Sequence, residues 1–221
     1  PFDFELCDCA LDRLSPSAVR PIFEELGFNR LTEALEVLAP ASAMPRAEPT
    51  PQTTAPAESE KYTLVDTPDE FADFVGQLAA QPEFAFDTET TGLNAVEVDI
   101  VGLSFAWKAG EAYYLPVRAV MGATLSLSDV VRRLKPIFEN PSIAKVGQNA
   151  KYDMLVLRQL GITVAGLRFD TMLASYLLDP MGRSHALDAL AKNLLGHEMI
   201  PITDLIGKGK DQLTMDQVDT R

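Results

Sequence analysis

Two acidic side chains stand two residues apart in the segment 86–90, which reads Phe-Asp-Thr-Glu-Thr. In a β-strand, residues i and i+2 point to the same face, so Asp87 and Glu89 would project together. At about 4 Å, two such carboxylates repel each other by about 4 kcal/mol when the effective dielectric constant is about 20. Cations relieve this repulsion, and hard divalent cations such as Mg²⁺ prefer carboxylate oxygen. The pair indicates a metal site, with a solvated strand end as the alternative.

A second polar pair, Asn149 and Asp153, stands four residues apart in the segment Asn-Ala-Lys-Tyr-Asp. We expect a helix over 149–160, directly behind a short buried strand, and residues i and i+4 share one face of a helix. Its first turns would lie at the carboxyl end of a sheet, where open α/β sheets bind ligands. Asp153 is therefore expected to meet Asp87 and Glu89. The alternative is a helix capped by Asn149, with Asp153 in solvent.

Composition limits the class of protein. The chain has 221 residues, of which 47% are hydrophobic and 23% charged, as in ordinary globular proteins. Its net charge is −13. This charge excludes a general duplex-DNA binder, because affinity for phosphate comes from Lys and Arg. Metal ions reverse the local charge, so an active site that holds a few nucleotides remains compatible with this composition.

The two cysteines, Cys7 and Cys9, are adjacent but one and suit neither a disulfide nor a zinc site. Reduced thiols are typical of the cytoplasm. No basic segment followed by an apolar run begins the sequence, and no apolar stretch reaches the roughly 18 residues of a membrane helix. We therefore expect a soluble cytoplasmic protein that makes no membrane contact.

The chain falls into three zones. Residues 1–38 contain a helix that starts at Ser15-Pro16 and stops at Gly27, and this zone is too short to bury a core alone. Residues 39–60 are rich in Ala, Pro, Thr, Ser and Glu, which predicts a flexible linker. Residues 61–221 carry both polar pairs.

The third zone alternates strand and helix patterns. Strands are expected near 62–65, 83–89, 99–107, 111–117, 143–147 and 167–169, and helices near 68–80, 126–140, 149–160, 170–178 and 185–195. Pro136 is expected to end or kink its helix early, and residues 201–221 are expected to be irregular. Three meandering strands followed by βα units predict an α/β fold with a mixed five-stranded sheet flanked by helices.

Together the two polar segments resemble the first and second motifs of the DEDD superfamily of 3′→5′ exonucleases. Further similarity is to the proofreading domain of bacterial family A DNA polymerases, and it lies in Val146-Gly147-Gln148-Asn149, Phe169-Asp170-Thr171-Met172-Leu173-Ala174-Ser175-Tyr176 and Gly207-Lys208-Gly209-Lys210-Asp211-Gln212-Leu213-Thr214. The resemblance covers about residues 61–221. It implies that residues 1–38 are the C-terminal tail of a 5′-nuclease-like domain and that residues 39–60 link the two domains.

The resemblance implies an RNase H-like fold and hydrolysis of 3′-terminal nucleotides of DNA by two divalent metal ions, Mg²⁺ or Mn²⁺. Asp87 would ligate both metals, Glu89 one metal and the attacking water, and Asp153 the second metal through water. One metal would make the nucleophilic hydroxide, and the other would stabilise the leaving 3′ oxygen. The implied partner is a single-stranded or frayed DNA 3′ end. The protein would be monomeric, continuous with a polymerase domain and without a small-molecule cofactor.

Four residues are candidates for substrate contact: Thr88, Leu93, Gln148 and Asn149. Leu93 matches an apolar position that packs against the terminal base, and an ordinary core leucine beside a turn is the alternative. Gln148 and Asn149 would touch the substrate backbone, or else only cap the helix that follows.

The family's third motif, a Tyr followed four residues later by Asp, is missing between Asp153 and Arg221. Tyr176 and Asp179 stand three apart, and we interpret them as helix packing and a helix end. The exonuclease domain is therefore expected to be truncated before its third motif, and the fragment alone to be weak or inactive.

Two rival functions remain. An RNase D-like 3′→5′ exoribonuclease shares the same motifs, but the 5′-nuclease-like tail and the segment 207–214 argue against it. A non-catalytic nucleic-acid-binding or structural domain is the second, and the three intact acids argue against it. Of the other polar residues, His185 and His197 are too few for a zinc site, and Lys208 and Lys210 either contact phosphate or lie in a solvated loop.

Overall fold

The computed structural model describes residues 15–38, 61–209 and 212–219. The chain divides into two compact units, Pro1–Thr54 and Ala55–Arg221, which are described separately. Cys7, Cys9 and the expected linker at 39–60 lie outside the described residues, so the predictions that concern them stay untested.

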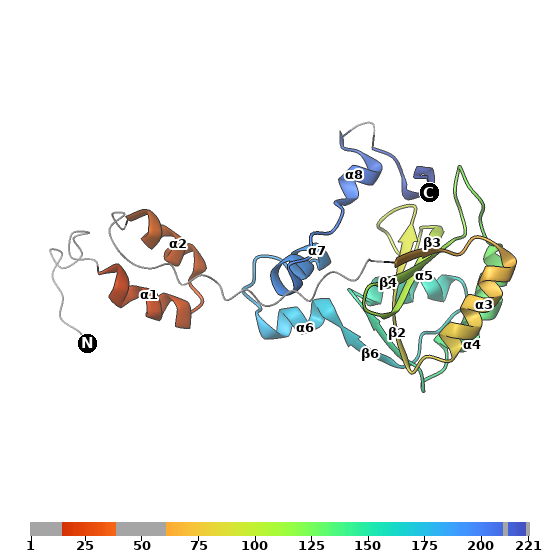
Figure 1. Cartoon of the computed structure of the whole chain (residues 1–221), viewed down its shortest axis with the longest axis horizontal. Helices are drawn as coiled ribbons and strands as arrows, with labels where there is room; N and C mark the ends of the chain where they lie inside the picture. The colour runs from red at the N-terminus through yellow and green to blue at the C-terminus, as the bar shows by residue number, and fades with distance from the viewer. Residues whose placement is uncertain (1–14, 39–60, 210–211, 220–221) are drawn as a thin grey trace. The chain divides into compact units, whose positions relative to one another are not determined.

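The first unit contains two short helices (Figure 1). Helix α1, Pro16–Glu25, begins with proline at its first position, and Gly27 follows it with φ of 67°, a left-handed conformation that commonly ends helices. Helix α2, Asn29–Leu38, was not anticipated from the sequence pattern. The origin of this unit in a 5′-nuclease-like domain remains a prediction.

The second unit is built on a mixed sheet of six strands in the order β1-β4-β3-β2-β5-β6. The strands are β1 Lys61–Leu64, β2 Glu83–Thr90, β3 Ile100–Lys108, β4 Glu111–Pro116, β5 Ala144–Gly147 and β6 Leu167–Asp170. Strands β2, β3 and β4 pair antiparallel, while β1 joins β4, β5 joins β2 and β6 joins β5 in parallel. The α/β prediction is confirmed, but the sheet has one strand more than expected, since β1 adds to the free edge of β4.

The helices of this unit are α3 Pro68–Ala79, α4 Leu127–Phe138, α5 Lys151–Gln159, α6 Thr171–Leu178, α7 Leu187–Leu190 and α8 Ile202–Ile206. Pro136 does not end α4, which continues to Phe138. The stretch expected to be irregular contains α8 and a 3₁₀ turn, Met215–Gln217, that lies against β2. None of the described helices is both long and apolar enough to cross a membrane.

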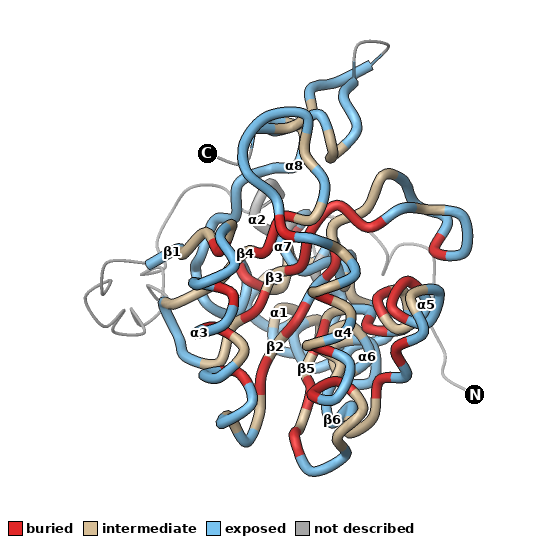
Figure 2. Tube along the Cα trace, turned by 90° about the vertical axis from the view of Figure 1, so that its right-hand side faces the viewer, coloured by how far each residue is buried: buried red, intermediate tan, exposed pale blue. Residues whose placement is uncertain are grey.

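An aromatic core holds β2 in place. Phe84 and Phe86 of β2 pack edge-on against Phe138 of α4, with ring centroids 5.8 and 5.1 Å apart, and Phe105 of β3 meets Phe74 of α3 at 5.2 Å. Figure 2 shows this buried band running along the central strands. Because β2 alternates, one face is committed to this core and the other carries the acidic residues.

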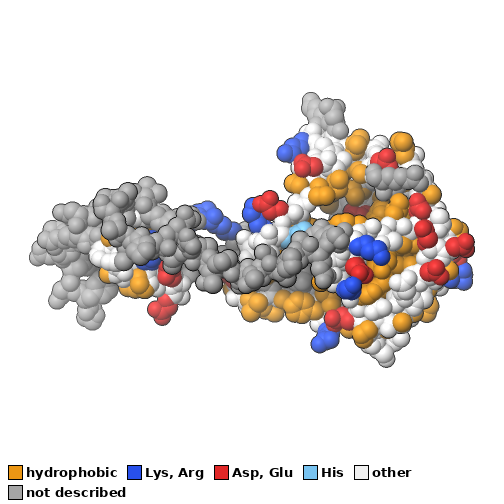
Figure 3. All heavy atoms as spheres, viewed as in Figure 1, with side chains coloured by type: hydrophobic (Ala, Val, Ile, Leu, Met, Phe, Trp, Pro, Cys, Tyr) orange, Lys and Arg blue, Asp and Glu red, His pale blue; other side chains and the backbone are white. Residues whose placement is uncertain are grey.

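One charged residue is buried beside this core. Lys145 of β5 is fully buried, lies over the ring of Phe84, and donates a 2.6 Å hydrogen bond from Nζ to the carbonyl oxygen of Asn140. Outside the core, apolar side chains are exposed along α6 (Figure 3), among them Leu173, Leu177 and Leu178.

Candidate active site

Strand β2 presents Asp87 and Glu89 on the face opposite to Phe84 and Phe86. On the side of β3, β2 is paired from Ala85 to Thr90, with a bulge between Glu89 and Thr90. On the side of β5, the pairing covers only residues 83–85. The second half of β2 is therefore open on one edge, and this is the half that carries both acids.

Helix α5 brings a third acid to that open edge. The backbone N–H of Thr88 and its hydroxyl both donate to Oδ1 of Asp153, at 2.9 and 2.6 Å. The carboxylate thus takes the place of a neighbouring strand for this N–H group, which would otherwise lose its partner where β5 ends. Asp153 is only 2% exposed, so its position is set by the fold.

The three carboxylates behave as one electrostatic unit. Burial raises the pKa of Asp87 to about 6, and the charge of Glu89 adds to this rise, although the Asp87 side chain still reaches solvent. Burial also raises the pKa of Glu89, helped by Asp153. The pKa of Asp153 is raised to about 6 by burial and by Asp87, against the lowering effect of the Thr88 hydrogen bonds. A cation bound near these three carboxylates would lower the pKa of each of them and favour their charged forms.

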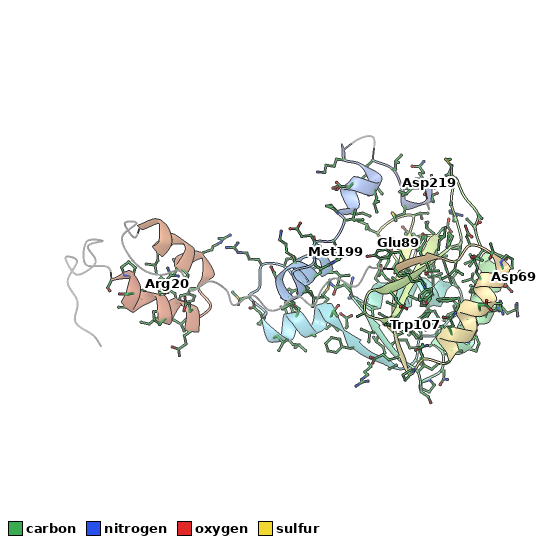
Figure 4. All side chains as sticks on the ribbon, viewed as in Figure 1. Arg20, Asp69, Glu89, Trp107, Met199 and Asp219 are labelled. Atoms are coloured by element: carbon green, nitrogen blue, oxygen red, sulfur yellow. The ribbon has the colours of Figure 1, made fainter. Side chains whose placement is uncertain are left out.

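The three carboxylates are ligands of the kind that hard divalent cations prefer, but they do not form a closed metal site by themselves. Within the described part of the chain, no three Asp, Glu, His or Cys side chains are arranged to hold a metal ion between them. Mg²⁺, however, is usually bound by one or two carboxylates together with substrate phosphates and water, not by a cage of protein ligands. Asp87, Glu89 and Asp153 are carboxylates of the required kind, and Figure 4 marks Glu89 on the sheet.

Tyr114 of β4 also faces the site, which the sequence analysis missed. It is aligned with Ser104 of β3, which in turn is aligned with Asp87, so the three residues share one face of the sheet. Its ring lies over Gly102, where a side chain would overlap it. Burial and the charge of Glu89 raise the pKa of Tyr114 to about 12. Tyr114 can be placed beside the acids only when the register of β2 with β3 and that of β3 with β4 are known. No local sequence pattern specifies either register.

A family model described as 3′-5′ exonuclease matches residues 62–218. The chain belongs to this 3′-5′ exonuclease family. It is 40% identical to DNA polymerase I of Pseudomonas aeruginosa over 227 residues, which covers 98% of this chain and 24% of the relative. It is 37% identical to DNA polymerase I of Chloroflexus aurantiacus, covering 91% of this chain and 24% of that protein. The exonuclease chain thus spans about a quarter of these relatives.

Solved structures agree with the fold. The POL domain of Pol1 from M. smegmatis, in complex with DNA primer-template and dNTP, superposes with a TM-score of 0.52 at 27% identity, over 62% of this chain and 23% of that one. The RNase D–GMP complex of Trypanosoma brucei has a TM-score of 0.52 at 19% identity, over 63% of this chain and 43% of that one. The second likeness shows the fold alone, which is the RNase H-like α/β fold expected of an exonuclease.

The end of β2 in this exonuclease is tied to α5 through hydroxyl groups. Thr90 Oγ1 and the hydroxyl of Tyr152 lie 2.7 Å apart, and each also lies 2.8 Å from the carbonyl oxygen of Gly92. The next residue, Leu93, is 96% exposed. Leu93 is therefore not a core leucine, and its side chain is exposed four residues beyond Glu89 in the chain.

The structure corrects the start of α5. The helix begins at Lys151, and Asn149 precedes it in a left-handed conformation with φ of 54°. Asn149 and Asp153 therefore do not share a helical face as expected. The reason is a carboxylate from another segment, Asp170, which accepts the N–H groups of Asn149 and Ala150 and holds them out of the helix.

Two of the four expected substrate contacts are engaged within the protein. Thr88 is only 6% exposed and its hydroxyl is bound to Asp153. The amide of Gln148 donates from Nε2 to the carbonyl oxygen of His185 at 2.9 Å and accepts from the hydroxyl of Thr171. In contrast, Asn149 is exposed, as is Leu93. Of the four candidates, Leu93 and Asn149 are therefore the two with exposed side chains.

The remaining polar candidates have local contacts of their own or lie outside the described residues. The ring of His185 accepts or donates a 2.8 Å hydrogen bond with Ser175 through Nδ1 and packs edge-on against Tyr176. This arrangement favours a structural role over a zinc ligand. Asp179 follows the last residue of α6, as the interpretation of a helix end predicts. Lys208 is exposed, and Lys210 lies outside the described residues.

Proposed function

We propose that this chain is the proofreading region of a DNA polymerase and removes nucleotides from DNA 3′ ends with the help of two divalent cations, Mg²⁺ or Mn²⁺. The observation that carries the proposal is the convergence of Asp87, Glu89 and Asp153, which raise one another's pKa, in a chain of the 3′-5′ exonuclease family. We further propose a monomer that is continuous with a polymerase domain. A cytoplasmic location remains a prediction.

The reaction is hydrolysis of the terminal phosphodiester. Water attacks the phosphorus, the bond from phosphorus to the 3′ oxygen of the preceding nucleotide breaks, and that oxygen takes a proton as a nucleoside 5′-monophosphate leaves. When bound, the cations lower the pKa of the attacking water and offset the charge that develops on the leaving oxygen. Asp87 would hold both cations, Glu89 would hold one cation and orient the water, and Asp153 would hold the second cation.

Other residues position these acids and the substrate. Thr88 holds Asp153 through two hydrogen bonds, so this carboxylate needs no rearrangement before it binds a ligand. Leu93 and Asn149 would contact the terminal nucleotide, because both are exposed and each lies four residues from one of the acids in the sequence. The net charge of −13 supports a short nucleic-acid footprint, in which cations supply most of the attraction for phosphate.

The test is release of mononucleotides from 3′-labelled single-stranded DNA and from RNA of the same sequence, with Mg²⁺, with Mn²⁺ and with EDTA. It should be run on the full-length protein that contains this chain, with Asp87→Ala as the control. We expect metal-dependent release from DNA that the substitution abolishes. Faster release from RNA would favour the exoribonuclease, and no release from either polymer would favour the non-catalytic domain.

The chain of 221 residues by itself offers a second comparison. It has no Tyr-x-x-x-Asp after Asp153, so we expect it to be weak or inactive beside a version extended through such a motif. Equal activity of the two versions would show that the three acids suffice.

A further inference from the structure

The carboxylate of Asp170 is placed between two helices. Asp170 is the last residue of β6 and is aligned with Gly147, the last residue of β5, so it lies at the carboxyl end of two neighbouring parallel strands. Its side chain accepts four backbone N–H groups: Oδ1 accepts those of Asn149 at 3.1 Å, Met172 at 2.9 Å and Leu173 at 3.1 Å, and Oδ2 accepts that of Ala150 at 2.8 Å.

These four bonds serve different purposes. The bonds from Met172 and Leu173 cap α6, the helix that Asp170 itself precedes, and this is an ordinary N-cap. The bonds from Asn149 and Ala150 reach a segment about twenty residues earlier in the chain, just before α5. A negative charge is favourable at the N-terminus of either helix, so a single carboxylate stabilises both starts.

The segment before α5 needs such support. Asn149 has φ of 54°, a left-handed conformation that residues other than glycine adopt only at a cost in free energy. Such a conformation persists where the surrounding structure enforces it. Ala150 is completely buried, and it lies so close to Gly147 that a Cβ there would come within 2.9 Å of the Ala150 Cβ. Thr171 adds a second attachment through its bonds to Gly147 and Gln148.

The same two residues begin the helix that carries the third acid. The carbonyl oxygen of Asn149 accepts the N–H of Tyr152, and that of Ala150 accepts the N–H of Met154, both at 2.9 Å. Asp170 thus accepts the N–H groups of these two residues, while their carbonyl oxygens accept the first hydrogen bonds of α5. Asp153 lies between Tyr152 and Met154 in that turn, so a shift of residues 149–150 moves Asp153 directly.

We propose that Asp170 is a positioning residue of the exonuclease, whose carboxylate fixes residues 149–150 and through them places Asp153 against β2. Its hydrogen bonds go to backbone N–H groups and not to the three acids, so it acts through the start of α5. The activity and metal-binding readouts of this proposal rest on the proposed function, whereas the hydrogen-exchange readout does not.

Asp170→Ser separates the two purposes of the carboxylate. A serine hydroxyl still caps a helix, but one oxygen on a shorter side chain cannot also reach Asn149 and Ala150. Thr67→Ala is the matched control, because Thr67 caps α3 by accepting the N–H of Glu70 and has no contact with the acids. The full-length protein carrying each substitution should be compared with wild type.

For Asp170→Ser we expect kcat and Mn²⁺ affinity to fall by about ten-fold or more, as for residues that orient metal ligands. The backbone N–H groups of Asn149 and Ala150 should exchange with solvent faster by a similar factor. Asp170→Asn keeps one oxygen acceptor and should fall between Asp170→Ser and wild type. Thr67→Ala should change kcat and Mn²⁺ affinity by less than about two-fold, because a lost cap lowers only stability.

The proposal is overturned if Asp170→Ser is folded and keeps the wild-type kcat and Mn²⁺ affinity. It is equally overturned if Thr67→Ala lowers both quantities as much as Asp170→Ser does. Should Asp170→Ser fail to fold, the same comparison of kcat, Mn²⁺ affinity and hydrogen exchange between Asp170→Asn and the wild-type protein tests the proposal. Rapid exchange of the Asn149 and Ala150 N–H groups in wild type would contradict the bonds to Asp170. If wild type releases no nucleotide, the proposed function fails, while hydrogen exchange at Asn149 and Ala150 still tests the role of Asp170.

Discussion

Thr88 and Asp153, 65 residues apart in the sequence, are joined by two hydrogen bonds to a single carboxylate oxygen. Thr88 lies between the two acids of β2, with its side chain turned to the opposite face, and it uses both its backbone and its hydroxyl to hold the third acid. The strand therefore supplies two acids directly and fixes the third through the residue between them. The site is assembled by the fold before any ligand binds.

Thr88→Val should destabilise the protein and lower its nuclease activity, whereas Thr88→Ser should preserve both more nearly. Valine has the shape of threonine but cannot donate to the buried Asp153, and a hydrogen bond to a charged group contributes about 1.5–3 kcal/mol. The free energy of unfolding, measured with urea at neutral pH, should fall by an amount in this range. Equal stability of the valine and serine variants would show that the hydroxyl bond to Asp153 contributes little.

The stability of the metal-free protein should fall as pH rises. Burial raises the pKa of Asp153 from its ordinary 3.8 to about 6 in the folded state. Between these values the folded protein binds more protons than the unfolded chain, so the contribution to stability is present below pH 3.8 and is lost as pH rises through about 6. Urea unfolding in EDTA across this range measures the loss, and Mg²⁺ should reduce it at the upper end.

Asp153→Asn isolates this effect, because the amide oxygen can still accept both Thr88 bonds but the side chain cannot ionise. In EDTA at neutral pH we expect the variant to be more stable than wild type by about 1–3 kcal/mol, since one pKa unit corresponds to about 1.4 kcal/mol. The difference should shrink toward acid pH, and the variant should have lost its nuclease activity. A difference in stability that does not depend on pH would contradict the raised pKa of Asp153.

Local patterns predicted the parts of the site that lie within one element. Alternation along β2 correctly placed Asp87 and Glu89 on one face, and the helix expected near 68–80 begins at Pro68. The parts that depend on which strands are neighbours escaped prediction. The start of α5 is set by Asp170, which reaches residues 149–150 only because β5 and β6 are adjacent.

The same limit explains why the position of Tyr114 beside the acids and the place of β1 in the sheet were not predicted. Tyr114 lies on the acidic face because of the registers of β2 with β3 and of β3 with β4, and neither register can be predicted from one segment of the sequence. The sixth strand, β1, is only four residues long and is recruited by the free edge of β4. Contacts of this kind arise from packing of the whole sheet, so a single sequence does not specify them locally.

Gly102→Ala should displace the ring of Tyr114, because a Cβ at this position would overlap its hydroxyl group and ring carbons. We expect stability to fall by about 1–3 kcal/mol, the usual cost of overpacking. The pKa of Tyr114, about 12 in the native arrangement, should move toward its ordinary value of 10.0 as the ring leaves its buried place beside Glu89. Ultraviolet titration of tyrosine measures this, with Tyr114→Phe identifying the signal.

A double substitution controls for other effects of the added methyl group. In the background of Tyr114→Ala, the space over Gly102 is vacant, so Gly102→Ala should cost much less stability than it does in wild type. Equal costs in the two backgrounds would mean that the ring of Tyr114 does not limit this position.

Leu93→Ala should weaken substrate binding without lowering stability. The Leu93 side chain is 96% exposed, so its removal leaves no cavity and should change the free energy of unfolding by less than about 0.5 kcal/mol. Because the proposed function places this exposed leucine against the terminal nucleotide, we expect a higher KM for single-stranded DNA. Leu178→Ala, at a position that is 88% exposed on α6, is the matched control and should leave KM unchanged. An unchanged KM in Leu93→Ala would remove this residue from the substrate site.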